Sequence, residues 1–223
     1  MRSERLAVTW SAALVLGACA TAPAAQRNAR AECTLPAGDS LVDVRALDRT
    51  IRTDIRYATP ANFTSQRLPG YEARLALLRP DAARALARVQ RALREQGLGL
   101  KVWDAYRPVR ATLAMVSWAE STGNQWVLEQ GYVARESGHN RGNTIDLTMV
   151  RLRTGRELDM GTPFDEFSAA AHTANAEGAV QENRHQLVAA MAREGFVNYD
   201  QEWWHFRRAG DERPLDAPLG CFR

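Results

Sequence analysis

Near the middle of this 223-residue chain lies Ser137-Gly-His-Asn-Arg-Gly-Asn-Thr-Ile-Asp146, and near its end lies Glu202-Trp-Trp-His205. In the first stretch a Ser/Gly/Asn loop leads into an apolar run, which predicts a buried strand. A tight turn there brings His139 and Asp146 toward one point, and His205 follows paired tryptophans that exclude water. Two imidazoles and one carboxylate are typical of a zinc site that keeps one coordination position open for water.

Glu202 supplies a further carboxylate three residues before His205. Such a group is the general base that a zinc-activated water needs, so the two motifs together indicate a zinc hydrolase. The alternative for the second motif alone is an aromatic strand with surface charges. The other two histidines, His172 and His185, stand in helix-like settings without a carboxylate at catalytic spacing, and we do not expect them to bind metal.

Hydrophobic periodicity predicts three helices. The first begins at Pro80, buries Ala82, Leu86, Val89 and Leu93, and ends before Gly97. The second begins at Pro108 and turns Val109, Leu113 and Val116 inward. The third spans residues 181–193, with Leu187, Val188 and Met191 facing the core.

Strands are predicted over residues 98–103, 144–150, 196–199 and 203–206, while residues 123–138 form a polar connection without a clear period. The expected fold is therefore α+β, with a small antiparallel sheet flanked by helices in a single domain. Length and a hydrophobic content of 45% also suit one domain with one core.

Charge argues against a nucleic-acid partner. The sequence has 29 Lys and Arg against 26 Asp and Glu, a formal net charge of +3, and it contains no run of five basic residues.

Residues 1–18 read as an export signal, with a positive start followed by a short apolar stretch. Leu16-Gly-Ala-Cys19 resembles the lipobox at which bacterial lipoproteins are cut and lipidated, so a lipid on Cys19 would anchor the protein to a membrane. Residues 19–36 would then form a leash, and residues 37–223 the folded domain. The expected location is the cell envelope or periplasm. The alternative is an ordinary signal peptide cleaved between residues 19 and 25.

Cys33 and Cys221 remain, one near each end of the folded part. Chain termini often lie close together, and exported proteins meet oxidising conditions, so we prefer a disulfide between them. The alternative is two unpaired thiols.

Three further stretches carry a family resemblance: Trp103-Asp-Ala-Tyr-Arg-Pro108, Arg56-Tyr-Ala-Thr with Asn62-Phe-Thr, and Met160-Gly-Thr-Pro-Phe-Asp165. With the two metal motifs, they make residues 43–206 resemble the zinc D-alanyl-D-alanine dipeptidases, which belong to the wider group of zinc D,D-peptidases. The resemblance implies that one zinc is bound by His139, Asp146 and His205, that Glu202 is the catalytic base, that Arg107 stabilises the reacting carbonyl, and that Tyr57 and Asp165 line the dipeptide pocket.

Two of these residues allow other roles, and a further candidate, Ser137, has two possible roles. Arg107 could serve only as a partner for Asp104, and Asp165 could cap a helix beginning near Glu166. Ser137 could bind the substrate carboxylate or hold the His139 loop.

The expected activity is hydrolysis of the D-Ala-D-Ala peptide bond to release D-alanine. A cytoplasmic member destroys the free dipeptide before it enters wall precursors, and an exported lipoprotein cannot do that. Export points instead to wall turnover or D-alanine scavenging. The alternatives are a D,D-carboxypeptidase acting on peptidoglycan stem peptides and a non-catalytic, zinc-containing wall-binding protein. A lysis protein would normally carry a separate wall-binding module, which this chain lacks.

Overall fold

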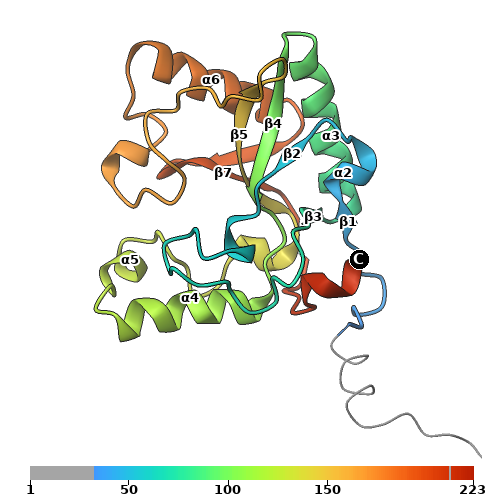
Figure 1. Cartoon of the computed structure of the whole chain (residues 1–223), viewed down its shortest axis with the longest axis vertical. Coiled ribbons are helices and arrows are strands. Elements are labelled where there is room, and N and C mark those ends of the chain that lie inside the picture. The colour runs from blue at the N-terminus through green and yellow to red at the C-terminus, as the bar shows by residue number, and fades with distance from the viewer. Residues whose placement is uncertain (1–32, 211) are drawn as a thin grey trace, which may run out of the picture.

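A five-stranded sheet with the strand order β2-β4-β5-β7-β6 forms the centre of the computed structural model, which describes residues 33–210 and 212–223 (Figure 1). Neighbouring strands run antiparallel, except that β2 lies parallel to β4 at one edge. A separate two-stranded antiparallel sheet joins β1 to β3. The strands are β1 Val42–Asp43, β2 Arg52–Thr53, β3 Leu77–Leu78, β4 Leu98–Asp104, β5 Thr144–Arg151, β6 Phe196–Tyr199 and β7 Glu202–Arg208.

Helices flank this sheet. α3 packs against β4, α6 packs against β6, and the two helices contact each other, while α4 and α5 lie together at the other end of the molecule (Figure 1). The α-helices are α2 Val44–Leu47, α3 Pro80–Arg94, α4 Val109–Ser121, α5 Trp126–Glu129 and α6 Gly178–Ala192. The 3-10 helices are η1 Arg56–Ala58, η2 Gly138–Arg141, η3 Ala169–Ala171 and η4 Leu219–Phe222. The α+β prediction is confirmed, with β2 as an addition that two residues are too few to predict.

The first predicted helix is α3, and its buried face is confirmed. Pro80 occupies the first turn and the four predicted apolar side chains are buried: Ala82, Leu86, Val89 and Leu93. Gln90, which is fully buried, accepts a hydrogen bond from the backbone N–H of Leu100 at 2.8 Å and donates one to Thr50 at 2.8 Å. A polar side chain thus fixes α3 to the start of β4.

The predicted inner face of α4 was partly wrong. Leu113 is 58% exposed, and the helix instead buries Ala111, Thr112, Met115, Val116 and Ala119. The Thr112 hydroxyl accepts a hydrogen bond from Asn140 Nδ2 at 2.9 Å. This polar contact turns the Thr112 side of the helix toward η2, and small alanines allow close packing there.

Two further boundaries differ from the prediction. The third predicted helix, α6, begins at Gly178, three residues earlier than expected, and it buries Arg184 together with Leu187 and Met191. Residues 123–138 are not a plain connection, because they contain α5 and the start of η2.

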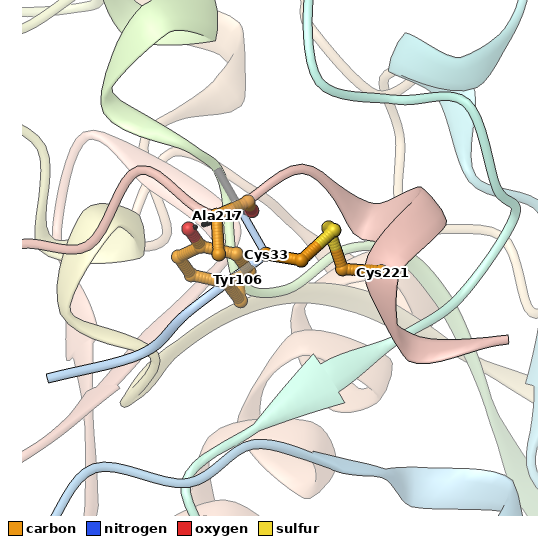
Figure 2. Close-up of a disulfide and its surroundings, with 4 residues drawn as sticks. All are labelled: Cys33, Tyr106, Ala217 and Cys221. Atoms are coloured by element: carbon orange, nitrogen blue, oxygen red, sulfur yellow. Dashed lines mark hydrogen bonds between the residues drawn. A yellow bond between two sulfur atoms is a disulfide. The ribbon is translucent and has the colours of Figure 1, made fainter. Parts of the chain in front are cut away.

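A disulfide joins Cys33 to Cys221, whose Cα atoms lie 5.3 Å apart (Figure 2). Beside it the Tyr106 hydroxyl donates a hydrogen bond to the backbone oxygen of Ala217 at 3.0 Å. Both contacts hold the C-terminal segment against the domain, so the start and end of the described chain are tied together.

The predicted export signal, Cys19 and the leash up to residue 32 lie outside the described residues. Within the described ranges, no helix has the length and apolar character needed to cross a membrane.

The disulfide closes a loop with a sequence separation of 188 residues. In the chain-entropy model such a link contributes roughly 5 kcal/mol to the free energy of unfolding. We therefore predict that the Cys33→Ser/Cys221→Ser protein has a markedly lower urea midpoint than the oxidised protein. The double variant should be insensitive to reductant, which serves as the control. An equal midpoint for the oxidised protein and the double variant would contradict the prediction.

Candidate metal centre

Three adjacent strands place three side chains in a row across the sheet. Asp104 at the end of β4 lies opposite Asp146 on β5, and Asp146 lies opposite His205 on β7. Directly opposed residues on antiparallel strands bring their side chains within contact distance. The strand register alone therefore brings together two of the predicted metal ligands, although they are 59 residues apart in sequence.

The third ligand comes from a loop with a fixed shape. Ser137 precedes η2, and its hydroxyl accepts a hydrogen bond from the backbone N–H of His139 at 3.2 Å. Asn140 completes the cap by accepting a bond from the Ser137 N–H at 3.2 Å. Gly142 then ends η2 with a φ of 73°, a conformation that favours glycine and lets the chain enter β5 at once. The structure thus supports the loop-holding role of Ser137, which also lines the pocket described below.

The donor atoms of His139, Asp146 and His205 lie within 4.8 Å of one another, close enough to hold one metal ion. His139 Nδ1 lies 2.7 Å from the backbone oxygen of Ala105, so Nδ1 carries the hydrogen and Nε2 faces Asp146 and His205 with a lone pair. The buried Asp146 Oδ1 has no well-aligned hydrogen-bond partner among the described residues. An unprotonated ring nitrogen and an unsatisfied carboxylate oxygen, pointing at one place, fit a divalent cation.

Protonation of the ligands also suits a metal. Burial lowers the pKa of His205, so its imidazole is neutral at neutral pH and can coordinate. Burial opposes ionisation of Asp146, but the neighbouring His139 and His205 prevail and hold its pKa below the ordinary value. Asp146 is therefore a carboxylate, as a ligand must be.

Arg107 reaches this centre from the turn after β4. Its Nε and one terminal nitrogen contact Asp104 Oδ2 at 3.0 and 2.8 Å, and the same terminal nitrogen lies 3.9 Å from Asp146. The guanidinium also covers the Tyr57 ring, with its carbon 5.0 Å from the ring centroid. The sequence left two roles open for Arg107, as a partner of Asp104 and as a stabiliser of the reacting carbonyl. The two roles are compatible, because Arg107 is bound to Asp104 and also lines the pocket.

Asp104 was not predicted as a site residue, yet it organises this corner. It is fully buried, accepts a hydrogen bond from Tyr71 at 2.5 Å and lies 3.3 Å from His139 Nδ1. Its place directly before Ala-Tyr-Arg107 in the quoted motif was the signal that could have identified it.

Glu202 lies beside the three ligands at the start of β7. It is 7% exposed, and its Oε2 is 3.5 Å from His205 Nδ1. Burial raises the pKa of Glu202 well above its ordinary value, and the carboxylates of Asp146 and Asp165 add to the effect. A cation held among these carboxylates would offset that rise, because an opposite charge nearby favours the ionised form.

Asp165 and Tyr57 face each other across the same pocket. The Tyr57 hydroxyl donates a hydrogen bond to Asp165 Oδ1 at 3.0 Å, whereas the buried Oδ2 has no partner among the described residues. Burial, reinforced by the charge of Asp146, raises the pKa of Asp165 to about 8. No helix follows at Glu166, since the next helical turn is η3 at residues 169–171, so the capping alternative for Asp165 is wrong.

These side chains line one cavity of about 230 Å³. Its walls include every predicted catalytic, metal-binding and substrate-binding residue: Tyr57, Arg107, Ser137, His139, Asp146, Asp165, Glu202 and His205. The aromatic rings of Phe63, Tyr132, Phe167 and Trp204 are also part of its lining. His172 is not part of the ligand group and instead pairs with the Tyr132 hydroxyl at 3.3 Å, and His185 is exposed on α6.

Comparisons with known proteins agree with this geometry. Residues 38–223 match the family model described as D-Ala-D-Ala dipeptidase. The chain is 36% identical to a D-alanyl-D-alanine dipeptidase of Enterococcus faecium, over 70% of this chain and 85% of that protein. It is 35% identical to one of Streptomyces coelicolor, over 76% of this chain and 93% of that protein. A third, from Escherichia coli, is 36% identical over 82% of this chain and 92% of that protein.

The match covers the whole described domain, the chain spans most of each relative, and the ligand group lies where the metal motifs predicted it. This chain belongs to the D-Ala-D-Ala dipeptidase family of zinc metallopeptidases.

Proposed function

We propose that this protein hydrolyses the peptide bond of D-alanyl-D-alanine and releases D-alanine, with one zinc ion bound by His139, Asp146 and His205. The observation that carries the proposal is the position of Glu202, a carboxylate outside the group of three ligands that is buried beside them in the same pocket. A purely structural zinc site has no use for such a base, which argues against the non-catalytic alternative.

The bound zinc supplies a Lewis acid that polarises the peptide carbonyl and lowers the pKa of a water molecule. Glu202 takes the proton of the attacking water and returns it to the leaving amine, since its carboxyl group lies beside the ligands and lines the pocket. Asp104 holds Arg107 with its guanidinium toward the pocket, where it can stabilise the negative charge on the carbonyl oxygen. One such donor typically lowers the barrier by about 3 kcal/mol.

The pocket also supports a dipeptide as the substrate. A free amino terminus is a cation, and burying it without a counter-charge is costly. Asp165 Oδ2 is buried and unpartnered, while Tyr57 fixes the orientation of the same carboxyl group. An ammonium placed at Oδ2 would satisfy this oxygen and favour the ionised form of Asp165. A substrate blocked at its amino terminus would leave it unpaired.

For the protein in the cell, we propose attachment to the envelope through a lipid on Cys19. The basis is the sequence Leu16-Gly-Ala-Cys19 after an apolar stretch. At this location the dipeptide would come from outside the cytoplasm, which favours wall turnover or D-alanine scavenging as the physiological role.

We predict that Glu202→Gln retains about one zinc per chain and lowers kcat on D-Ala-D-Ala by at least the roughly hundredfold typical of lost acid–base catalysis. The change keeps the size of the side chain and removes only its ability to take a proton. Metal analysis and steady-state kinetics on the same preparation measure both effects. The matched control is His205→Ala, which should lose zinc. Near-normal turnover by zinc-loaded Glu202→Gln, or full zinc content in His205→Ala, would overturn the assignment.

We predict that the unaltered enzyme cleaves D-Ala-D-Ala and rejects its N-acetylated form. Asp165→Asn should raise KM for the free dipeptide about tenfold to hundredfold, as expected for the loss of a hydrogen bond between charged groups worth about 1.5–3 kcal/mol. Zinc content should not change. Glu166→Gln removes the neighbouring carboxylate, which does not line the pocket, and is the matched control. Efficient cleavage of the acetylated dipeptide or a stem pentapeptide would support the D,D-carboxypeptidase alternative.

We predict that Cys19→Ser moves the protein from the membrane fraction to the soluble fraction, because the lipid attachment site is lost. Cys33→Ser/Cys221→Ser should stay with the membrane, which controls for the loss of cysteine as such. Fractionation followed by immunoblotting measures the distribution. A Cys19→Ser protein that remains in the membrane fraction would rule out the lipid anchor.

A further inference from the structure

Arg184 on α6 is almost fully buried, with 1% of its surface exposed. All five N–H donors of its guanidinium group contact backbone oxygens. Nε and Nη2 contact the oxygen of Met160 at 2.9 and 2.6 Å, and Nη2 also contacts that of Ala170 at 3.0 Å. Nη1 contacts the oxygens of His172 and Asn175 at 2.8 and 3.4 Å. One guanidinium therefore satisfies carbonyl groups from two separate parts of the chain.

The carbonyl groups of Met160, Ala170 and His172 lie at the two ends, or feet, of one loop, residues 160–172, and that of Asn175 follows just after it. The loop runs beside α6 and is orange in Figure 1. Met160 stands at the first foot, and Ala170 and His172 at the second, so Arg184 sets the distance between them. Trp203 on β7 anchors the loop at a further point, because its Nε1 donates a hydrogen bond to Thr162 Oγ1 at 2.8 Å.

The segment between the feet forms one wall of the catalytic pocket. Asp165 and Phe167 both line the cavity, and Phe164 stacks on Trp103 with ring centroids 4.9 Å apart. Asp165 has a φ of 63°, a backbone conformation that side-chain-bearing residues rarely adopt. Such a conformation persists only where surrounding contacts impose it.

Arg184 differs from the other two deeply buried arginines in its charge environment. Arg79 contacts Asp39 at 2.5 Å and Arg107 contacts Asp104 at 2.8 Å, whereas Arg184 forms no ion pair with any described residue. An arginine keeps its charge in proteins, so burying this one without a direct ion pair is costly. The hydrogen bonds to backbone oxygens, with the face of the Trp203 ring 6.0 Å from the guanidinium carbon, offset this cost.

We infer that Arg184 is a positioning residue for substrate specificity: by fixing both feet of residues 160–172, it holds the Asp165 carboxyl group where the substrate's amino terminus binds. This inference rests on the proposed function. It assigns Arg184 to substrate affinity, because the guanidinium makes its hydrogen bonds with the loop and its flank, and none with the metal ligands or Glu202. Its contact with β7 is the face of the Trp203 ring, whose centroid lies 6.0 Å from the guanidinium carbon. Loosening the loop should therefore change KM while zinc binding and kcat stay close to those of the unaltered enzyme.

Arg184→Lys tests this, because it keeps the charge and stem but lacks the fork that reaches both feet. In the zinc-loaded full chain we expect KM for D-Ala-D-Ala to rise at least about tenfold, with kcat and zinc content changed less than about threefold; small displacements of positioning groups have effects of this size or larger. In the Arg184→Lys background, Asp165→Asn should add little further increase in KM. Arg88→Lys is the control for helix docking, since Arg88 joins α3 to Glu194 just after α6 and contacts no loop residue.

Hydrogen exchange separates this inference from the proposed function. In Arg184→Lys, the amides of Ala171 and His172, which are hydrogen-bonded within the second foot, should exchange faster than in Arg88→Lys. Unchanged exchange there, or fully additive effects of Arg184→Lys and Asp165→Asn on KM, would overturn the positioning role. If the unaltered enzyme failed to cleave D-Ala-D-Ala, the proposed function and the specificity role would fall together. Faster exchange in that case would leave Arg184 only as an anchor of the loop.

Discussion

Three carboxyl groups line the catalytic pocket with the guanidinium of Arg107, and a fourth, that of Asp104, is buried against this guanidinium. Asp104 and Asp146 lie beside Arg107, and Asp165 and Glu202 complete the set. Carboxylates brought together in a site of low polarity raise one another's pKa unless positive charge is placed among them. Arg107 supplies one such charge, and the pair of histidines with Asp146 provides the place for a divalent ion. Much of the structure around the pocket holds these charged groups in fixed positions.

The sheet performs that task for the metal ligands. Because Asp146 and His205 are directly opposed on neighbouring strands, their relative positions follow from backbone hydrogen bonds rather than from flexible side chains. His139 is the exception, and its loop is correspondingly fixed by the Ser137 cap and by the contact of its Nδ1 with Ala105. The hydrogen bond from Nδ1 to the Ala105 oxygen determines that the other ring nitrogen faces the ion.

The sequence was informative wherever chemistry or periodicity is local. The α3 face followed from apolar spacing, and the metal motifs followed from residue type and spacing. The sequence failed where a distant contact decides the outcome. Leu113 fits the helical period, yet α4 turns Thr112 inward, where its hydroxyl accepts a hydrogen bond from Asn140 of η2. The burial of Arg184 could not be predicted from the helix sequence, because its carbonyl partners lie in a separate segment that has no recognisable periodicity.

The pocket thus has two kinds of wall with different physical origins. The metal ligands and Glu202 stand on strands or on a capped turn against the sheet, so backbone hydrogen bonds fix their geometry. Asp165 stands on a loop, in a left-handed conformation, and depends on distant anchors such as Arg184 and Trp203. On the roles proposed for Glu202 and Asp165, chemistry and substrate selection therefore depend on different parts of the fold. The loop can change which peptide enters the pocket, while the strands continue to present the same ligands and the same base.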